Sequence, residues 1–357
     1  MMEKLKIHSC FKLNDCSFKD IDELLAFVKL HNFEGKEFLE SWFDEESYII
    51  VTTSGSTGAP KAIKIKKEHM LNSAKATGSY FGLFEKTTAL LCMSSKFIAG
   101  KMMWVRALSL GWELDVVEVN SKPLGSIEKS YDFAAMVPLQ VSNSLVKMNY
   151  IRSLIIGGGS VSKELQEQIE LLNTKVFATY GMTETVTHIA VKKLNYLLGE
   201  KHRYYHTLPS VIISKDERGC LVIDAPLLSN KKIVTNDLVD LISENSFEWL
   251  GRFDSIINSG GVKLIPELIE SKISKIVSCN FFLIGVKDSY LGEKLALVIE
   301  AVGTSIFEKS EIKNFLKKAR LGPFEIPKEI HFVSEFEMTE TGKIRRESSF
   351  AKVARKH

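Results

Sequence analysis

A short run of small and hydroxylated residues carries the clearest chemical signal in this sequence. It reads Thr53-Ser54-Gly55-Ser56-Thr57-Gly58-Ala59-Pro60-Lys61. Small residues let backbone N–H groups converge into a nest for anionic oxygens, the hydroxyls add donors, and Lys61 adds a positive charge. The spacing of a Walker A loop is absent, and Ala62 follows the lysine. The run therefore indicates a phosphate-binding loop, with an ordinary surface turn as the alternative.

Further clusters of glycine, acidic and basic residues follow along the chain. They are Gly157-Gly158-Gly159, Tyr180-Gly181-Met182-Thr183-Glu184, Thr235-Asn236-Asp237, Gly251-Arg252-Phe253-Asp254 and the segment around Lys343. A carboxylate such as Glu184 suits a hard cation that bridges phosphates, although the same residue type also starts helices. Considered alone, Lys343 is a solvated charge in a basic tail.

Taken together and in this order, the clusters resemble the motifs of the adenylate-forming superfamily, which includes acyl- and aryl-CoA ligases. The resemblance implies an enzyme that binds ATP and Mg²⁺ and uses coenzyme A as a co-substrate. Tyr180 is implied to stack on adenine, and Asp237 and Arg252 to hold the ribose hydroxyls. The residues that the resemblance assigns to ATP are Thr53, Ser54, Gly55, Ser56, Thr57, Gly58, Lys61, Gly157, Gly158, Gly159, Tyr180, Gly181, Asp237 and Arg252.

The same resemblance assigns catalysis to Lys343, Thr183 and Glu184. A substrate carboxylate attacks the α-phosphorus of ATP and pyrophosphate leaves, so charge grows on the phosphoryl oxygens and positioning supplies most of the catalysis. By resemblance, Lys343 bridges the incoming carboxylate and the α-phosphate, Thr183 contacts that phosphate, and Glu184 is the metal ligand. Asp254 is implied to be the hinge about which a C-terminal lid swings before the thiol of coenzyme A attacks.

The segment from Phe97 to Arg106 resembles the helix beside the acyl pocket of 2-succinylbenzoate–CoA ligases of menaquinone biosynthesis. Phe97, Gly100, Arg106 and His188 are the predicted substrate residues, and Phe97 stands where those enzymes often have histidine. A buried Arg106 suits the second carboxylate of a dicarboxylic aromatic acid through charge-assisted hydrogen bonds. The alternative is that Arg106 pairs with a nearby acidic residue of the protein.

Two departures from the family pattern concern a single residue and the length. Asn236 replaces the usual glycine before Asp237. The phosphate loop begins near residue 53, whereas most relatives carry a longer preceding segment, so the sequence predicts a shortened but active ligase. The alternatives are a different aryl- or acyl-CoA ligase, a catalytically silent adenylate-binding homologue and a carrier-protein adenylation domain.

The elements that position these residues alternate between short β-branched runs and amphipathic stretches. Strands are predicted at 48–53, 62–65, 89–93, 114–119, 133–137, 154–156 and 175–179, and a helix at 68–80. The alternation predicts an α/β architecture with a largely parallel sheet. Near Leu250 the pattern changes to a smaller α+β segment that ends in a helix at 310–318, a strand at 330–333 and a basic tail. We therefore predict an AMP-binding domain over 1–250 and a lid domain over 251–357.

Composition excludes several other classes of protein. Of 357 residues, 45% are hydrophobic and 25% charged, which is typical of a globular chain and not of a disordered one. The net charge of +3 and the short apolar runs predict neither a nucleic-acid partner nor membrane insertion. Five scattered cysteines without a Cys-x-x-Cys pair predict a cytoplasmic protein with reduced thiols. The sequence leaves open whether the protein forms a homo-oligomer.

Overall fold

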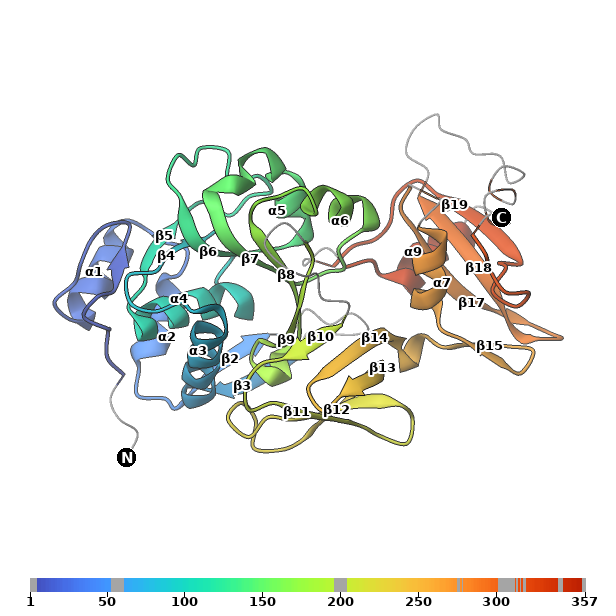
Figure 1. Ribbon diagram of the computed structural model, residues 1–357, viewed down its shortest axis with the longest axis horizontal. Coiled ribbons are helices and arrows are strands. Elements are labelled where there is room, and N and C mark those ends of the chain that lie inside the picture. The colour runs from blue at the N-terminus through green and yellow to red at the C-terminus, as the bar shows by residue number, and fades with distance from the viewer. Residues whose placement is uncertain are drawn as a thin grey trace. The chain divides into compact units, whose positions relative to one another are not determined.

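The computed structural model describes residues 5–52, 61–195, 204–274, 277, 279–300, 312, 314, 316, 319–339 and 343–354 (Figure 1). The chain divides into two compact units. The first comprises Met1–Ile213, Ile223–Ile233 and Ser243–Ser246, and the second comprises Ser214–Val222, Val234–Ile242 and Phe247–His357. Among the helices of the described ranges, none is both long and apolar enough to cross a membrane.

A parallel sheet forms the centre of the first unit. Its parallel strands, in spatial order, are β1 (Lys12–Leu13), β5 (Glu113–Val116), β4 (Thr88–Leu91), β6 (Tyr131–Met136), β7 (Ile151–Ile156) and β8 (Lys175–Gly181). Antiparallel strands β9 (His188–Lys193) and β10 (Tyr205–Thr207) continue it. The inner strands are buried along most of their length because helices cover a parallel sheet on both faces.

Helix α4 (Ile98–Leu110) is buried over most of its length. Residues from Met102 to Leu108 are all buried, because the helix packs against α3 (Lys67–Phe81) and against β4 and β5 (Figure 1). Phe97 precedes its first turn, and Gly111 ends it in the left-handed conformation at φ +70°. The remaining helices of this unit are α1 (Ile21–Leu30), α2 (Lys36–Phe43), α5 (Pro138–Ser142), η1 (Leu145–Tyr150), α6 (Lys163–Ile169) and η2 (Thr183–Thr185).

A separate hairpin flanks the predicted phosphate loop. Its strands, β2 (Tyr48–Thr52) and β3 (Ala62–Lys66), pair antiparallel over their whole length. Lys67, directly after β3, is fully buried, and its ammonium pairs with Asp44 Oδ1 at 2.6 Å. This ion pair fixes the base of the hairpin, since a buried charge that loses its partner is costly. The segment from Thr53 to Pro60 joins the two strands and lies outside the described residues.

The second unit contains parts of β11 (Ile212–Lys215), β12 (Cys220–Asp224), β13 (Ile233–Ser243) and β14 (Ser246–Arg252), followed by η3 (Phe253–Ser255). A second sheet has the order β16 (Val262–Leu264), β15 (Ile257–Ser259), β18 (Gly292–Glu300) and β17 (Phe281–Asp288). Strand β19 (Glu329–Val333) pairs with β18. Helices α7 (Pro266–Ile273) and α9 (Arg346–Ala354) complete the described elements, and apolar side chains on both faces of this sheet form two core clusters.

The α/β class and every predicted strand of the parallel sheet are confirmed. The antiparallel strands between residues 188 and 252 were not among the predicted elements, and the expected basic tail contains helix α9. Of the helix predicted at 310–318, only Ile312, Asn314 and Leu316 belong to the described residues, all helical. The lid arrangement, the domain boundary at residue 250 and the hinge at Asp254 stay predictions.

Candidate functional site

Two of the predicted motifs meet at the carboxyl ends of neighbouring parallel strands. Gly157 follows β7, and Tyr180 and Gly181 end β8. Thr179 Oγ1 donates to the Ile156 carbonyl at 2.9 Å and joins the two strand ends. Ligands of open α/β sheets bind outside the carboxyl ends of their strands, so this edge is the expected place for a nucleotide.

Glycine is required at two positions of this edge for lack of space. A Cβ atom on Gly181 would lie 2.3 Å from the Thr187 carbonyl oxygen, and one on Gly157 would lie 2.9 Å from Thr179 Oγ1. Gly158 has a positive φ of +80°, which favours glycine. The Tyr180 ring is half-buried and lies 6.0 Å from the Tyr205 ring. Local packing therefore explains why glycine stands at these positions, and the lack of side chains leaves the backbone open to a ligand.

The first two residues of η2, Thr183 and Glu184, differ in exposure. Thr183 is half-buried, whereas Glu184 is exposed. No hydrogen bond or ion pair engages the Glu184 carboxylate within the described part of the chain. An exposed carboxylate with free oxygens, beside a threonine hydroxyl, suits Mg²⁺, which prefers oxygen ligands and keeps several waters.

Arg106, Thr187 and His188 form one hydrogen-bonded cluster inside the first unit. Arg106 from α4 is 2% exposed, and its Nη2 donates to Thr187 Oγ1 at 3.2 Å. The His188 backbone N–H donates to the same hydroxyl oxygen. The hydroxyl proton of Thr187 is therefore directed to His188 Nδ1, 3.0 Å away. Since Nδ1 accepts this bond, the neutral imidazole carries its proton on Nε2.

Two buried N–H donors of this cluster are unsatisfied. Within the described residues, neither Arg106 Nε nor His188 Nε2 has a hydrogen-bond partner, and no carboxylate pairs with the guanidinium. Burial without an anion lowers the pKa of Arg106 to about 9. Burial, and secondarily the Arg106 charge, lower the pKa of His188 to about 3, so His188 is neutral near pH 7. Buried donors without partners are rare and costly, so the arrangement fits a missing acceptor such as a carboxylate.

The other two predicted substrate residues lie at the start of α4. Phe97 is half-buried at the N-cap position. Gly100 is buried, and a Cβ atom there would lie 2.3 Å from the Ser94 carbonyl oxygen. Gly100 therefore lets the first turn of α4 pack on the preceding turn, and its contact with a substrate stays a prediction.

In the second unit the structure brings the predicted ribose residues together. Arg252 Nη1 lies 3.6 Å from Asp237 Oδ1, and Trp249 Nε1 donates to the same oxygen at 3.1 Å. Arg252 also forms a two-pronged pair with Asp254, at 3.0 and 2.8 Å, and this pair lowers the pKa of the Asp254 carboxyl. Asp237 is thus held in place by partners on a neighbouring strand.

Asn236, the departure from the family pattern, has a structural partner. Its Oδ1 accepts from Arg218 Nη1 at 2.9 Å, and Arg218 Nη2 donates to the Thr235 carbonyl at 3.0 Å. The Arg218 guanidinium lies 5.1 Å from the centre of the Phe253 ring. With asparagine in place of glycine, the segment before Asp237 is therefore held by hydrogen bonds to Arg218.

Lys343, in the second unit, is hydrogen-bonded to Thr339 through its backbone. Its backbone N–H donates to Thr339 Oγ1 at 3.0 Å, and its carbonyl accepts from Thr339 N at 2.8 Å. The residue is exposed. Nearby Arg346 pairs with Glu270 at 2.9 Å and fixes the start of α9. The backbone of Lys343 is thus held in place, while its exposed side chain can reach an external ligand.

Of the predicted phosphate-loop residues, only Lys61 belongs to the described part of the chain, where it is exposed. The assignments of Thr53, Ser54, Gly55, Ser56, Thr57 and Gly58 lie outside the described residues. Sequence reasoning missed Thr187 and Trp249. No local signal marked Thr187 except its place beside His188.

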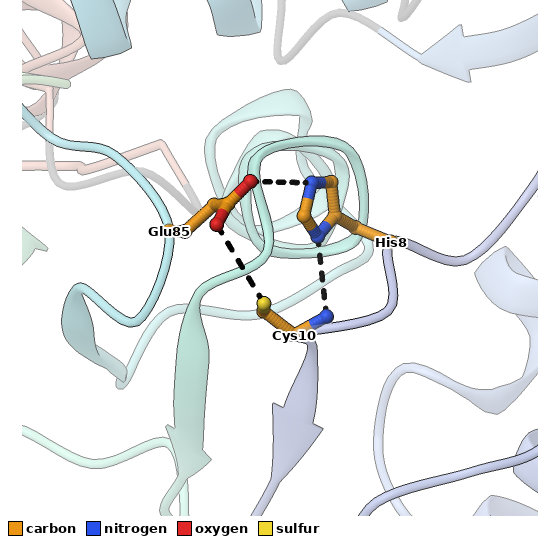
Figure 2. A group of neighbouring side chains, drawn as sticks. All are labelled: His8, Cys10 and Glu85. Atoms are coloured by element: carbon orange, nitrogen blue, oxygen red, sulfur yellow. Dashed lines mark hydrogen bonds and ion pairs between the residues drawn. The ribbon is translucent and has the colours of Figure 1, made fainter.

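A third group, His8, Cys10 and Glu85, offers metal-ligand atoms close together (Figure 2). The Cys10 backbone N–H donates to His8 Nδ1 at 3.2 Å, so the ring proton of neutral His8 is on Nε2, 3.3 Å from Glu85 Oε1. Cys10 Sγ lies 3.7 Å from Glu85 Oε2. Both ring nitrogens are therefore engaged, and the group acts as a hydrogen-bonded clamp beside Gly111 at the end of α4.

Comparisons with known proteins show the family and the fold of this chain. Residues 19–211 match the family described as AMP-binding enzyme. The chain is 25% identical over 339 residues to the 2-succinylbenzoate–CoA ligase of Listeria monocytogenes, covering 88% of this chain and 72% of that protein. A crystal structure of an AMP-forming acyl-CoA synthetase/AMP-acid ligase II-like protein from Dyadobacter fermentans is 35% identical. It covers 90% of this chain and 93% of its own, with a TM-score of 0.58.

The fold is also similar to that of o-succinylbenzoate–CoA synthetase from Bacillus subtilis in complex with ATP and magnesium. The identity is 20%, the TM-score is 0.74, and the similarity covers 93% of this chain and 82% of that one.

Proposed function

Because this chain belongs to the AMP-binding family of adenylate-forming enzymes, we propose that it is an acid–CoA ligase that activates 2-succinylbenzoate. The superfamily resemblance of the sequence motifs is confirmed by the family match. The relatives named 2-succinylbenzoate–CoA ligase, and the Dyadobacter protein named as an AMP-forming acyl-CoA synthetase/AMP-acid ligase II-like protein, support an acid–CoA ligase.

The observation that carries the choice of acid is the pair of unsatisfied donors beside Thr187. 2-Succinylbenzoate has two carboxylates, and only one of them is consumed by adenylation. The other needs a partner that holds a negative charge without reacting. Arg106 Nε and His188 Nε2 are buried donors without an acceptor, so they suit that second carboxylate.

The first half-reaction joins the substrate to AMP. The reacting carboxylate oxygen forms a bond to the α-phosphorus of ATP, the bond to the pyrophosphate oxygen breaks, and pyrophosphate leaves. Lys343 supplies a positive charge between the carboxylate and the α-phosphate, where charge accumulates in the transition state. Asp237, oriented by Trp249 and Arg252, binds the ribose. Glu184 would hold Mg²⁺, which would neutralise charge on the phosphates when bound.

The second half-reaction transfers the acyl group to coenzyme A. The thiolate attacks the acyl carbonyl carbon, the bond to the AMP oxygen breaks, and AMP leaves. In this proposal the predicted lid, residues 251–357, turns about Asp254 between the two steps and withdraws Lys343. Two hydrogen bonds join the Arg252 guanidinium to the carboxylate of this proposed hinge residue.

ATP–pyrophosphate exchange with a matched pair of acids tests the proposal. 4-Oxo-4-phenylbutanoate has the reacting chain of 2-succinylbenzoate but lacks the ring carboxylate. We expect the protein to prefer 2-succinylbenzoate by about 10- to 100-fold in kcat/KM, the value of a hydrogen bond to a charged group. In Arg106→Met this preference should fall toward unity, because the variant loses activity chiefly with the dicarboxylate.

A control and a wider panel complete the experiment. Arg152→Met removes an exposed arginine near the amino end of β7, opposite the carboxyl ends of the strands, and should leave the preference for 2-succinylbenzoate unchanged. Exchange that is strongest with a fatty acid, a benzoate or an amino acid, and insensitive to Arg106, would contradict the choice of substrate. Absence of exchange with every acid would favour the silent adenylate-binding homologue.

A further inference from the structure

The residues that follow Glu184 form a strained turn. Val186 has φ 66° and ψ −64°, and the Thr187 N–H donates to the Thr185 carbonyl at 2.8 Å. This is a γ-turn with positive φ, which is rare and strained, above all for a β-branched residue. The Val186 side chain is 1% exposed and so is held by packing. Strain of this kind persists only where the surroundings enforce it.

The Thr185 hydroxyl is the group that spans this turn. Its side chain is fully buried, and Oγ1 lies 2.7 Å from the Thr187 carbonyl oxygen and 2.9 Å from the Met182 carbonyl oxygen. Oγ1 also accepts from the Met182 N–H at 2.9 Å. The single hydroxyl thus connects Met182, the residue before η2, with Thr187, the last residue of the γ-turn.

The two ends of the spanned segment serve different parts of the proposed reaction. Glu184 lies between Thr183 and Thr185 in η2 and is exposed. At the other end, the hydroxyl oxygen of Thr187 accepts a hydrogen bond from the Arg106 guanidinium. A shift of either end moves the other, because only Thr185 and Val186 separate them.

We propose that Thr185 is a positioning residue that holds two neighbours in register with each other: the metal ligand Glu184, and Thr187, whose hydroxyl contacts the acid-binding Arg106 and His188. This inference rests on the proposed function for the roles of the two ends. It adds that binding of Mg²⁺–ATP and binding of the acid depend on the same buried hydroxyl, although Thr185 touches neither ligand.

Two substitutions separate the hydroxyl from the shape of the side chain. Thr185→Val keeps the shape and removes the hydroxyl, whereas Thr185→Ser keeps the hydroxyl. In pyrophosphate exchange with 2-succinylbenzoate, Thr185→Val should raise both the KM for the acid and the Mg²⁺ concentration for half-maximal rate by about tenfold to 100-fold. A displacement of about 1 Å near the chemistry has effects of this size. Thr185→Ser should stay within about threefold of the unaltered protein, as expected when the hydroxyl itself is responsible.

A matched control distinguishes the role from general loss of a buried hydroxyl. Thr174, just before β8, is 1% exposed and donates to the Met148 carbonyl at 2.6 Å. Thr174→Val makes the same chemical change at the opposite end of the strand and should alter neither value. Equal effects of the two valine variants, or an effect of Thr185→Val on kcat alone, would overturn the proposal.

Hydrogen–deuterium exchange of the full chain without substrates gives a second readout. The peptide over 182–188 should exchange faster in Thr185→Val than in the unaltered protein, and Thr185→Ser should restore its protection. Unchanged protection in Thr185→Val would show that the hydroxyl does not hold the turn and would overturn the inference, whichever acid the protein activates. Failure of the proposed function appears separately, as absence of exchange with 2-succinylbenzoate in the unaltered protein.

Discussion

Replacing Arg106 by methionine should make the substrate-free protein more stable, although core substitutions usually destabilise. Burial lowers the pKa of Arg106 from 12.5 to about 9 with no carboxylate partner among the described residues. At 1.36 kcal/mol per pKa unit, holding this charge in the folded free protein costs about 5 kcal/mol. Methionine is unbranched and fills irregular space, so it removes the charge at little steric cost.

The gain is reduced by the contacts that the guanidinium makes. Its bonds to Thr187 Oγ1 and Met103 Sδ stabilise the folded state by about 1–3 kcal/mol together. The expected net effect of Arg106→Met is therefore a rise of about 2–4 kcal/mol in the free energy of unfolding, as when a buried charge is replaced by an apolar group.

Urea denaturation of the free protein measures this effect, with the slope m expected to stay unchanged. Saturating 2-succinylbenzoate should stabilise the unaltered protein and have a much smaller effect on Arg106→Met, because linkage follows affinity. Arg152→Met, at an exposed pair with Asp132, should change the free energy of unfolding by about 1 kcal/mol or less. If Arg106→Met instead lowered the free energy of unfolding by about 2 kcal/mol or more, the buried charge would not be destabilising and the guanidinium would have a structural role.

Three further predictions concern the reaction, the pH dependence and the N-terminal segment. Lys343→Ala should slow pyrophosphate exchange by about 10²–10³-fold, the scale for one preorganised charge donor. The exposed Lys287→Ala serves as its control, and near-normal exchange in Lys343→Ala would remove this lysine from the mechanism. Burial lowers the pKa of His188 from 6.5 to about 3, so the unfolded chain binds the extra proton and stability falls as the pH drops below 6.5. Between pH 7 and pH 5 this lowers the free energy of unfolding by about 2 kcal/mol. Denaturation at both pH values should show this loss in the unaltered protein and not in His188→Gln. Glu34 accepts from the Ser95 N–H with both carboxylate oxygens, at 2.9 and 2.8 Å, just before α4. Glu34→Ala should therefore raise the KM for the acid by about tenfold with that for ATP unchanged, and equal changes in both would indicate a general loss of structure.

The sequence alone was sufficient for the parallel sheet and for the chemistry expected at its edge. Short β-branched runs and the glycines beside them are local features, and parallel strands bring their carboxyl ends to one edge. Gly157 and Gly181 could therefore be predicted to lie near each other. The motifs around Glu184, Asp237 and Lys343 suggested the family and the reaction through their resemblance to the motifs of the adenylate-forming superfamily.

The tertiary structure alone decided which polar groups have partners. From the sequence, Arg106 could equally have paired with an acidic residue. Only the folded chain shows that its guanidinium donates to Thr187, a residue far along the sequence, and that its Nε has no hydrogen-bond partner among the described residues. The γ-turn at Val186 and the reach of the Thr185 hydroxyl likewise depend on surroundings that enforce a strained backbone. Periodicity reports which face of an element is buried, whereas hydrogen-bond satisfaction depends on contacts between distant segments, and these exist only once the chain has folded.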